Sequence, residues 1–205
     1  HSDVMSTRGT GFAMLSSGNV QEAQDFAAIS HLSTLKSQIP FLHFFDGFRT
    51  SHSMQKIAEL DYETLANMLD MKYVERFRSG GLRPEDPVCK VGAQNPDVYF
   101  QGRETVNKYY DEAPAIVQQY MDLFYKETGR KYELFEYVGD PNAEKIIISM
   151  GSSVETIEET IKYLTAKGEK VGALKVRLYR PFSVEAFMHK IPATVKKIAV
   201  LDRTK

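Results

Sequence analysis

The sequence has one cysteine, Cys89, no tryptophan, and no apolar run long enough to cross a lipid bilayer. A single cysteine cannot form an internal disulfide, a structural zinc site or an iron–sulfur cluster within the chain. The N-terminus also lacks the charged and then apolar pattern of a secretory signal peptide. These absences are typical of a protein in a reducing, intracellular compartment.

The sequence also has no large excess of charge of either sign. The 26 Lys and Arg residues balance 27 Asp and Glu residues, for a formal net charge of -1. This balance gives no electrostatic footprint for nucleic acid or an anionic membrane, so neither is an expected partner. His31, His43 and His52 lack metal-ligand spacing, so no metal site is predicted.

The first third of the chain alternates strand and helix. A short strand is predicted over Asp3–Thr7 and a second over residues 12–16. Asn19 and Glu22 have the spacing of a capping box, and the apolar residues that follow predict an amphipathic helix. A buried strand is expected over residues 40–45. The result is a β–α–β unit, which is typical of a parallel sheet covered by helices.

The middle of the chain is less regular. Short helices are predicted around Met54–Leu60 and over Tyr62–Phe77, and glycines and prolines interrupt residues 79–101. A further helix is expected over Ala113–Thr128, with Pro114 at its first position. A loop as long as residues 79–101 is usually functional or a connector.

A second α/β unit is predicted from Tyr137 onward. A buried strand near residues 145–150 precedes Ser152 and Glu155, which form another capping-box pattern before an amphipathic helix. Strands over 171–178 and 197–201 flank a short helix at 181–190. The predicted fold class is therefore α/β, in two units with parallel-type sheets flanked by helices. The predicted division is 1–136 and 137–205.

Polar side chains gather just after the strand at 40–45. Asp46, Arg49 and Thr50 follow it within one turn. In open α/β sheets, ligands bind at the carboxyl ends of strands, so these residues are candidates for lining a site. The alternative is that Asp46 and Arg49 pair with each other and cap the following helix, and the pattern alone favours it.

Other candidates carry weaker signals. Arg8, between a predicted strand and a glycine-flanked turn, either holds a carboxylate or is a surface residue, and spacing alone favours the surface. Gly151-Ser152 at a helix start has a common phosphate-binding pattern. Asp202 to Lys205 follow a strand's carboxyl end, whereas Ser16 and Ser17 are most simply turn residues.

Several longer strings resemble the pyruvate:ferredoxin (flavodoxin) oxidoreductase family, and the resemblance runs essentially from end to end. The strings that carry it include Arg8-Gly-Thr-Gly-Phe-Ala-Met-Leu15, Pro40-Phe-Leu-His-Phe-Phe-Asp-Gly-Phe-Arg-Thr-Ser-His52, Tyr99-Phe-Gln-Gly-Arg103, Ser149-Met-Gly-Ser-Ser153, Val176-Arg-Leu-Tyr-Arg-Pro-Phe182 and Leu201-Asp-Arg-Thr-Lys205.

The resemblance implies an enzyme that converts pyruvate and coenzyme A to acetyl-coenzyme A and carbon dioxide. It implies thiamine diphosphate with magnesium, and [4Fe-4S] clusters that pass electrons to ferredoxin or flavodoxin. The full enzyme would be a homodimer in the cytoplasm, or in an anaerobic organelle of a eukaryote. Residues 1–136 would be the latter part of its N-terminal, pyrimidine-side domain with a connector. Residues 137–205 would start its transketolase-C-like domain.

By the same resemblance, Arg8 matches the family arginine that meets the substrate carboxylate, and Thr10 is its neighbour in the loop. Asp46, Arg49 and Thr50 carry the motif without an assigned role. Gly9 departs from the larger polar residue expected after that arginine, which puts keto-acid preference in question.

Parts of the family's machinery are missing. The cofactor-activating glutamate would lie upstream, the diphosphate and magnesium motif belongs to a later domain, and cluster cysteines are absent. We therefore expect the chain alone to be inactive and to bind none of these cofactors tightly, with the remaining domains as its partners. Two alternatives stay open: a non-catalytic α/β interaction module, and another 2-oxoacid oxidoreductase.

Overall fold

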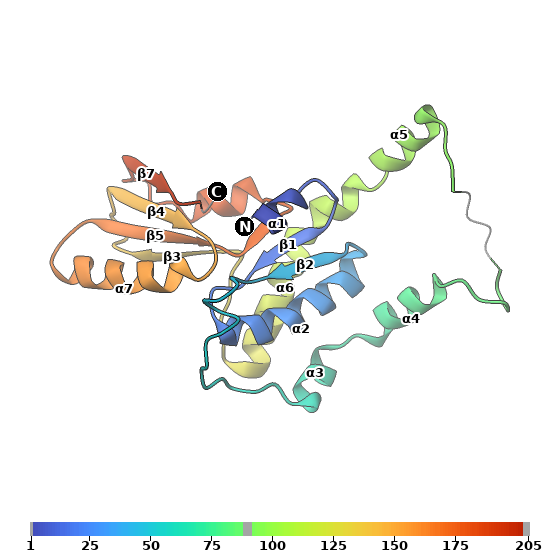
Figure 1. Cartoon of the computed structure of the whole chain (residues 1–205), viewed down its shortest axis with the longest axis horizontal. Helices are drawn as coiled ribbons and strands as arrows, with labels where there is room; N and C mark the ends of the chain where they lie inside the picture. Colours follow the sequence, from blue (N-terminus) through green and yellow to red (C-terminus); the bar gives the residue numbers. More distant parts are fainter. Residues whose placement is uncertain (1, 88–91, 203–205) are drawn as a thin grey trace.

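The computed structural model describes residues 2–87 and 92–202, which form two small sheets flanked by helices and an extended arm (Figure 1). The first sheet has the strand order β2-β1-β6. Strands β1 (Ala13–Ser16) and β2 (Phe41–Phe44) are parallel, and α2 (Val20–Ser37) connects them. The predicted β–α–β unit is therefore confirmed. Strand β6 (Leu178–Arg180) adds to β1 in the antiparallel direction.

The second sheet has the order β3-β5-β4-β7. Strand β4 (Lys145–Ser149) lies parallel to β5 (Val171–Val176) and to β7 (Lys197–Val200), and β3 (Phe135–Gly139) is an antiparallel edge. Helix α7 (Ser153–Ala166) covers one face of this sheet (Figure 1). The predicted α/β class is confirmed, with one antiparallel strand in each sheet.

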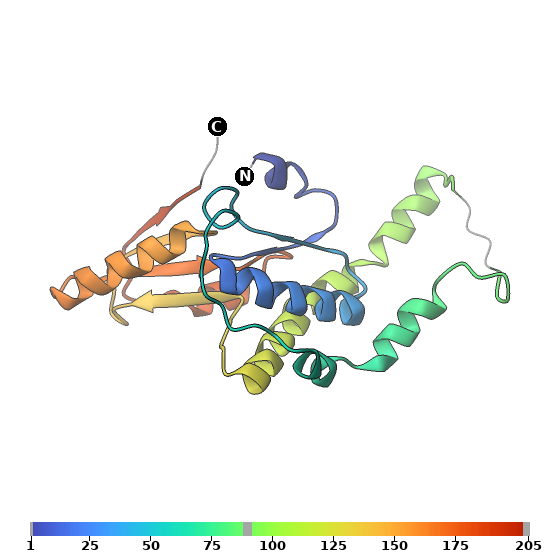
Figure 2. The same cartoon turned by 60° about the horizontal axis from the view of Figure 1, so that its bottom comes forward.

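Helix α6 (Asn107–Thr128) lies beside α2 beneath the first sheet in both views (Figures 1 and 2). Burial of apolar side chains joins the layers, because fully or nearly fully buried residues from α2, α6 and both sheets form one continuous cluster. Phe26, Phe124 and Leu174 are among its largest members, each at most 1% exposed. The two sheets therefore share a core.

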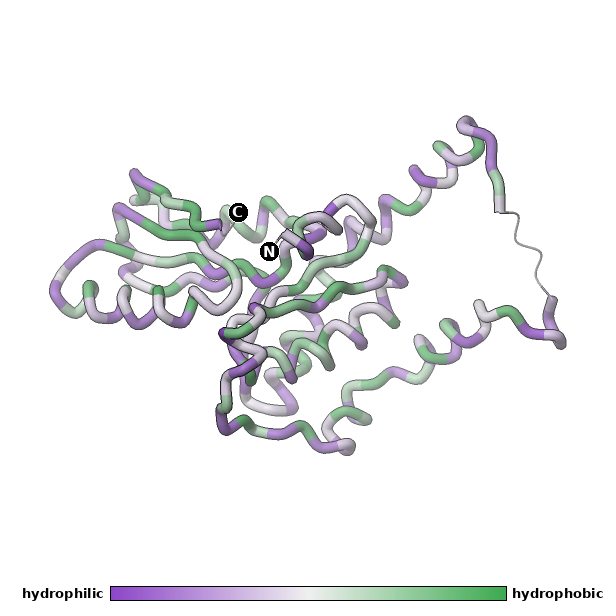
Figure 3. The backbone as a smooth tube through the Cα atoms, in the orientation of Figure 1, coloured by the Kyte–Doolittle hydropathy of each residue, from purple (hydrophilic) through white to green (hydrophobic). Residues whose placement is uncertain are grey.

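The arm consists of α3 (Tyr62–Met68), α4 (Met71–Ser79) and α5 (Pro96–Glu104) and extends away from the sheets (Figure 1). Hydrophobic stretches recur along it (Figure 3), and none of the residues of α4 or α5 is buried. The described part of the interrupted sequence from residue 79 to 101 thus contains most of α5, a helix that the glycine and proline pattern did not predict.

The helix predicted over Met54–Leu60 is wrong. This segment has no regular secondary structure, and amide side chains of α2 bind its backbone at Ala58. The Ala58 N–H donates to Gln21 Oε1 at 2.7 Å, and the Ala58 carbonyl accepts from Gln24 Nε2 at 2.9 Å. A backbone bonded to side chains in this way has no need of helical partners.

Two further predictions are corrected. Asp3–Thr7 is not a strand: α1 (Ser2–Ser6) is helical, and the Thr7 hydroxyl donates to the Val4 carbonyl at 2.7 Å. Pro114 is not the first residue of its helix, since α6 begins at Asn107 and includes Pro114 in its interior. The C-terminal stop at Gly129 has the left-handed φ of 74° that favours glycine.

The chain passes directly from the second sheet to the first, because only Arg177 separates β5 from β6. Strand β6 therefore completes the first sheet although it follows the predicted division at residue 136. The assignment of 1–136 and 137–205 to two domains stays a prediction. Helix α8 (Val184–His189) follows, near the helix predicted over 181–190.

Candidate functional site

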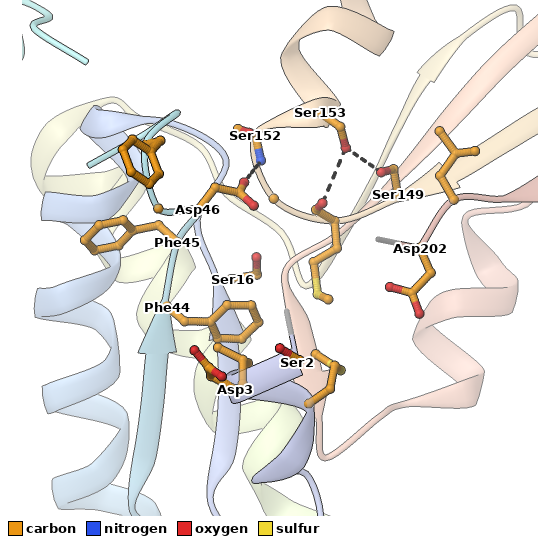
Figure 4. Close-up of a pocket in the computed structure, with 17 residues that line it drawn as sticks. Ser2, Asp3, Ser16, Phe44, Phe45, Asp46, Ser149, Ser152, Ser153 and Asp202 are labelled. Carbon is orange, nitrogen blue, oxygen red and sulfur yellow. Dashed lines mark hydrogen bonds between the residues drawn. The ribbon is translucent and has the colours of Figure 1, made fainter. Parts of the chain in front are cut away.

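A pocket of about 660 Å³ lies where the carboxyl ends of strands from both sheets meet (Figure 4). Ser16 ends β1, Phe44 ends β2 and Ser149 ends β4, and all three line it. We call this cavity the intersheet pocket. Its other lining residues are Ser2, Asp3, Val4, Met5, Phe45, Asp46, Gly47, Phe48, Met150, Gly151, Ser152, Ser153, Leu201 and Asp202.

The side chain of Asp46, which follows β2, contacts the start of α7 at this pocket. Its Oδ2 accepts a hydrogen bond from the backbone N–H of Ser152, at the start of α7 (Figure 4). A carboxylate is stabilised there by the positive end of the helix dipole. Gly151 fits this contact, because its φ is +80° and an added Cβ would lie 2.7 Å from Asp46 Oδ2. The capping box predicted for Ser152 and Glu155 is wrong, since the Ser152 side chain makes no capping hydrogen bond.

The polar groups of the intersheet pocket are mainly hydroxyls and carboxylates. The hydroxyl of Ser16 is buried and has no hydrogen-bond partner among the described residues, whereas the Ser149 and Ser153 hydroxyls lie 2.6 Å apart. Asp3 and Asp202 add acidic groups, and no Lys or Arg of the described residues lines the cavity. With Phe44 as an apolar wall, the pocket suits a ligand that has both apolar surface and hydrogen-bond donors.

A second pocket of about 510 Å³ lies beside it, at the starts of α2 and α7. We call it the helix-start pocket. Arg49 and Thr50 line it, together with Gly18, Asn19, Val20, Ser53, Gln55, Ser152, Ser153, Glu155, Thr156, Ile157 and Leu201. The predicted group Asp46, Arg49 and Thr50 is thus divided between two neighbouring pockets.

The alternative in which Asp46 pairs with Arg49 is wrong within the part of the chain that the structure describes. No ion pair joins the two side chains, and the residues that follow form a turn and then a segment without regular secondary structure. Asp46 uses its backbone carbonyl for the turn, accepting from the N–H groups of Thr50 and Ser51, each at 3.2 Å. Its carboxylate is free to contact Ser152.

Arg8 and Thr10 lie in the exposed loop after α1 and line neither pocket. The Arg8 guanidinium donates through Nη1 to the Met5 carbonyl at 2.6 Å, and the Thr10 hydroxyl donates to the Thr7 carbonyl at 2.6 Å. Their roles in binding a substrate stay predictions.

A buried polar network, which was not predicted from the sequence, links α2 with β3 through Arg177. Arg177, only 5% exposed, donates from Nη2 to Glu22 Oε1 at 2.8 Å and from Nη1 to Glu136 Oε2 at 2.5 Å. Glu22 also accepts from the Gly18 N–H at 2.7 Å. Burial opposes ionisation of Glu136, but Arg177 and Lys175 outweigh it and hold its pKa below the usual range.

His43 is held neutral by its surroundings. Burial, with a smaller contribution from nearby His31, lowers the pKa of His43 to about 4. Its Nε2 lies 2.6 Å from the hydroxyl of Ser17, and its ring lies edge-on to Phe26. The Ser17 and His43 pair faces the core, so we assign it a structural role.

The stability of the chain is expected to depend on pH through His43. The pKa of His43 in the folded state, about 4, lies below the ordinary 6.5. The neutral His43 side chain therefore contributes fully to the free energy of unfolding above pH 6.5, and this contribution is lost as pH falls towards 4. We expect a loss of about 1–2 kcal/mol in unfolding free energy between pH 7 and pH 5. Urea unfolding at both pH values should show a smaller change in unfolding free energy for His43→Gln than for the wild type. The exposed control His189→Gln should show the same change as the wild type. Equal changes in all three proteins would contradict the assignment.

Comparison with known proteins now identifies the family. Residues 1–122 match the family described as "Pyruvate flavodoxin/ferredoxin oxidoreductase, thiamine diP-bdg". Residues 143–205 match "Pyruvate:ferredoxin oxidoreductase core domain II". The chain belongs to the pyruvate flavodoxin/ferredoxin oxidoreductase family. The resemblance inferred from the sequence strings is confirmed.

Relatives of this oxidoreductase family align with the whole chain. A pyruvate:ferredoxin oxidoreductase of Moorella thermoacetica is 58% identical over 205 residues, which are 100% of this chain and 18% of the relative. A pyruvate-flavodoxin oxidoreductase of Trichormus variabilis is 59% identical over 205 residues, 100% of this chain and 17% of the relative. The chain thus spans less than a fifth of the length of these relatives.

A solved structure supports the fold. The 2-oxoglutarate:ferredoxin oxidoreductase from Magnetococcus marinus, with 2-oxoglutarate, coenzyme A and succinyl-CoA bound, matches with a TM-score of 0.58. It is 17% identical, and the match covers 92% of this chain and 34% of that chain.

Within residues 2–87 and 92–202, no helix is long and apolar enough to cross a membrane.

The residues of the intersheet pocket do not by themselves fit the cofactors that the sequence resemblance implies. The acidic lining of the intersheet pocket offers no cation to a diphosphate, and no cluster of three or more His, Cys, Asp or Glu residues in the described ranges is arranged to hold a metal ion. A [4Fe-4S] cluster needs four thiolates, and the sequence has only Cys89, which lies outside the described residues.

Proposed function

We propose that this chain is a section of a thiamine-diphosphate-dependent pyruvate:ferredoxin or pyruvate:flavodoxin oxidoreductase. The observation that carries the proposal is identity of 58–59% along all 205 residues to two enzymes of that name. The whole protein would convert pyruvate and coenzyme A to acetyl-coenzyme A and carbon dioxide. Its electrons would leave through [4Fe-4S] clusters to ferredoxin or flavodoxin.

The remaining domains of the whole protein would supply what this chain lacks. They would hold magnesium with the cofactor's diphosphate, ligate the clusters and provide the group that activates the cofactor. The bound cofactor supplies the carbon chemistry of the reaction. A homodimer in the cytoplasm, or in an anaerobic organelle of a eukaryote, is part of the same proposal.

Within this scheme Arg8 binds the carboxylate of the keto acid. Only Nη1 of its guanidinium is used in the described structure, for the Met5 carbonyl, so other N–H donors remain for a carboxylate. A bidentate pair with Arg8 would fix the orientation of the keto acid, and correct positioning is a large part of catalysis. Thr10, two residues later in the same exposed loop, is a candidate second donor.

Replacing Arg8 tests this role in the whole protein. Arg8→Gln should raise the KM for pyruvate by about tenfold or more, because a charge-assisted hydrogen bond to the carboxylate is lost. The KM of Arg8→Lys should fall between those of the wild type and Arg8→Gln, since lysine keeps the charge without the bidentate geometry. Initial rates of coenzyme A-dependent ferredoxin reduction give the KM for pyruvate of each protein. Exposed Arg78→Gln on α4 is the matched control, and an Arg8→Gln enzyme with wild-type KM would refute the assignment.

The alternative enzyme is one that prefers another 2-oxoacid. The solved relative has 2-oxoglutarate bound, which is the reason to test this alternative. At 17% identity, that structure supports only the fold. Gly9 beside Arg8 is the local departure that would alter keto-acid preference. Comparing kcat/KM for pyruvate and 2-oxoglutarate in the whole protein distinguishes the two. Preference for pyruvate supports the proposal, and preference for 2-oxoglutarate overturns it.

A further inference from the structure

The helix-start pocket is built where two helices begin side by side. A Cβ added to Gly18, before α2, would lie 2.9 Å from Val154 and 3.4 Å from the Gly151 carbonyl, at the start of α7. Asn19 Nδ2 also donates to Glu155 Oε1 at 3.0 Å. Two helix N-termini, each with roughly half a positive charge, thus open onto one cavity.

Two groups of this pocket that can donate hydrogen bonds have no partner among residues 2–87 and 92–202. The Thr50 hydroxyl is the decisive one: the residue is 7% exposed, and its Oγ1 is buried with no partner among the described residues. The Arg49 guanidinium forms no ion pair or hydrogen bond within residues 2–87 and 92–202, and it lines the same cavity. Buried polar groups in proteins are nearly always satisfied, so an unpartnered hydroxyl in a pocket points to a ligand.

Two of the acceptors that line this pocket are already used. Glu155 Oε1 accepts from the Asn19 amide. The Asn19 side-chain oxygen accepts from the Glu22 N–H at 2.8 Å. A ligand that brings acceptor oxygens would satisfy the Arg49 guanidinium and the Thr50 hydroxyl.

We infer that the helix-start pocket binds a phosphate group, held by the Arg49 guanidinium, the Thr50 hydroxyl and the starts of α2 and α7. A phosphate carries three acceptor oxygens that point in different directions, which suits donors that converge from a turn and two helices. A carboxylate has only two such oxygens. The inference does not depend on the proposed function, because it rests on donors that this chain supplies.

Titration of the chain with inorganic phosphate, by calorimetry at constant ionic strength, tests the site. We expect saturable binding that is at least about tenfold tighter than binding of acetate, the carboxylate probe, since phosphate uses more of the donors. Inorganic pyrophosphate is the third probe, and it distinguishes a diphosphate from a monophosphate occupant. Equal weak binding of phosphate and acetate would overturn the inference.

Three variants assign the site, and circular dichroism checks that each keeps its helices. Arg49→Gln should weaken phosphate binding by about tenfold or more through loss of the cation. Glu155→Gln should strengthen it a few-fold, because a neighbouring negative charge is removed. Arg78→Gln on the arm, far from the pocket, should change nothing. Wild-type affinity in Arg49→Gln would refute the site.

Thr50→Val separates a ligand contact from a merely buried hydroxyl. Because Oγ1 has no partner, replacing it by a methyl group should leave thermal stability unchanged or slightly higher without phosphate. Phosphate affinity should nevertheless fall about threefold or more. An unchanged affinity would show that this hydroxyl does not contact the ligand and would contradict the inference.

Discussion

Arg177→Met is expected to lower the free energy of unfolding by about 3–5 kcal/mol, the largest effect we predict for a single substitution. The guanidinium lies between two carboxylates, at 2.8 Å from Glu22 and 2.5 Å from Glu136. Glu22 is only 7% exposed, so without Arg177 its charge would be buried and uncompensated. Urea unfolding followed by circular dichroism measures the change.

A second substitution tests the cause of that loss. In the double variant Glu22→Gln/Arg177→Met, the uncompensated charge is gone, so part of the lost stability should return. Lys162→Met removes a cation from an exposed pair on α7, where the Lys162 side chain is 56% exposed, and should cost less than about 1 kcal/mol. A small effect of Arg177→Met, or no recovery in the double variant, would contradict the role of this network.

Asp25→Asn is expected to have the second largest effect, a loss of about 2–4 kcal/mol. Asp25 is fully buried on α2 and accepts from Arg130 Nε at 2.7 Å and from the Tyr132 hydroxyl at 2.6 Å. Burial and the hydrogen bond to Asp25 raise the pKa of Tyr132, so its hydroxyl stays a donor. An amide removes the charge that pairs with Arg130 and presents an N–H towards groups that are donors themselves.

The matched control is Asp122→Asn on α6. Asp122 is exposed, and among the described residues its side chain accepts only from the Gln118 side chain, at 2.9 Å, so this change should lie within about 0.5 kcal/mol of zero. Thermal unfolding of both variants under one set of conditions gives the comparison. If Asp25→Asn were as mild as Asp122→Asn, the buried contacts of Asp25 would not support the packing of α2 against the end of α6.

The local features of the fold could be predicted because neighbouring residues determine them. Asn19 caps α2 by accepting from the Glu22 N–H, and the apolar spacing after Ser153 gives α7. The helix predicted around Met54–Leu60 was an error where distant residues contribute, whereas the strand predicted over Asp3–Thr7 missed a local contact of the Thr7 hydroxyl with the Val4 carbonyl. The segment around Ala58 is not helical, and Gln21 and Gln24 bind its backbone, a contact that no pattern within the segment indicates.

The site was only partly predictable for the same reason. The turn after β2 was found from its polar residues at a strand end, and it does line the two pockets. Its partners lie far away in sequence: Asp46 contacts Ser152 across 106 residues, and Glu22 contacts Arg177 across 155. A single sequence has no periodicity at such separations, so neither contact could be predicted.

The central claim is that these residues are a section of a larger thiamine-diphosphate enzyme. The most direct test is the mass of the native polypeptide that contains them, with analysis of its bound iron and thiamine diphosphate. We predict a polypeptide more than five times the length of this chain, since the chain spans 17–18% of its relatives, carrying both groups. A native polypeptide near 23.3 kDa, purified in a particle that holds neither iron nor thiamine diphosphate, would contradict the claim.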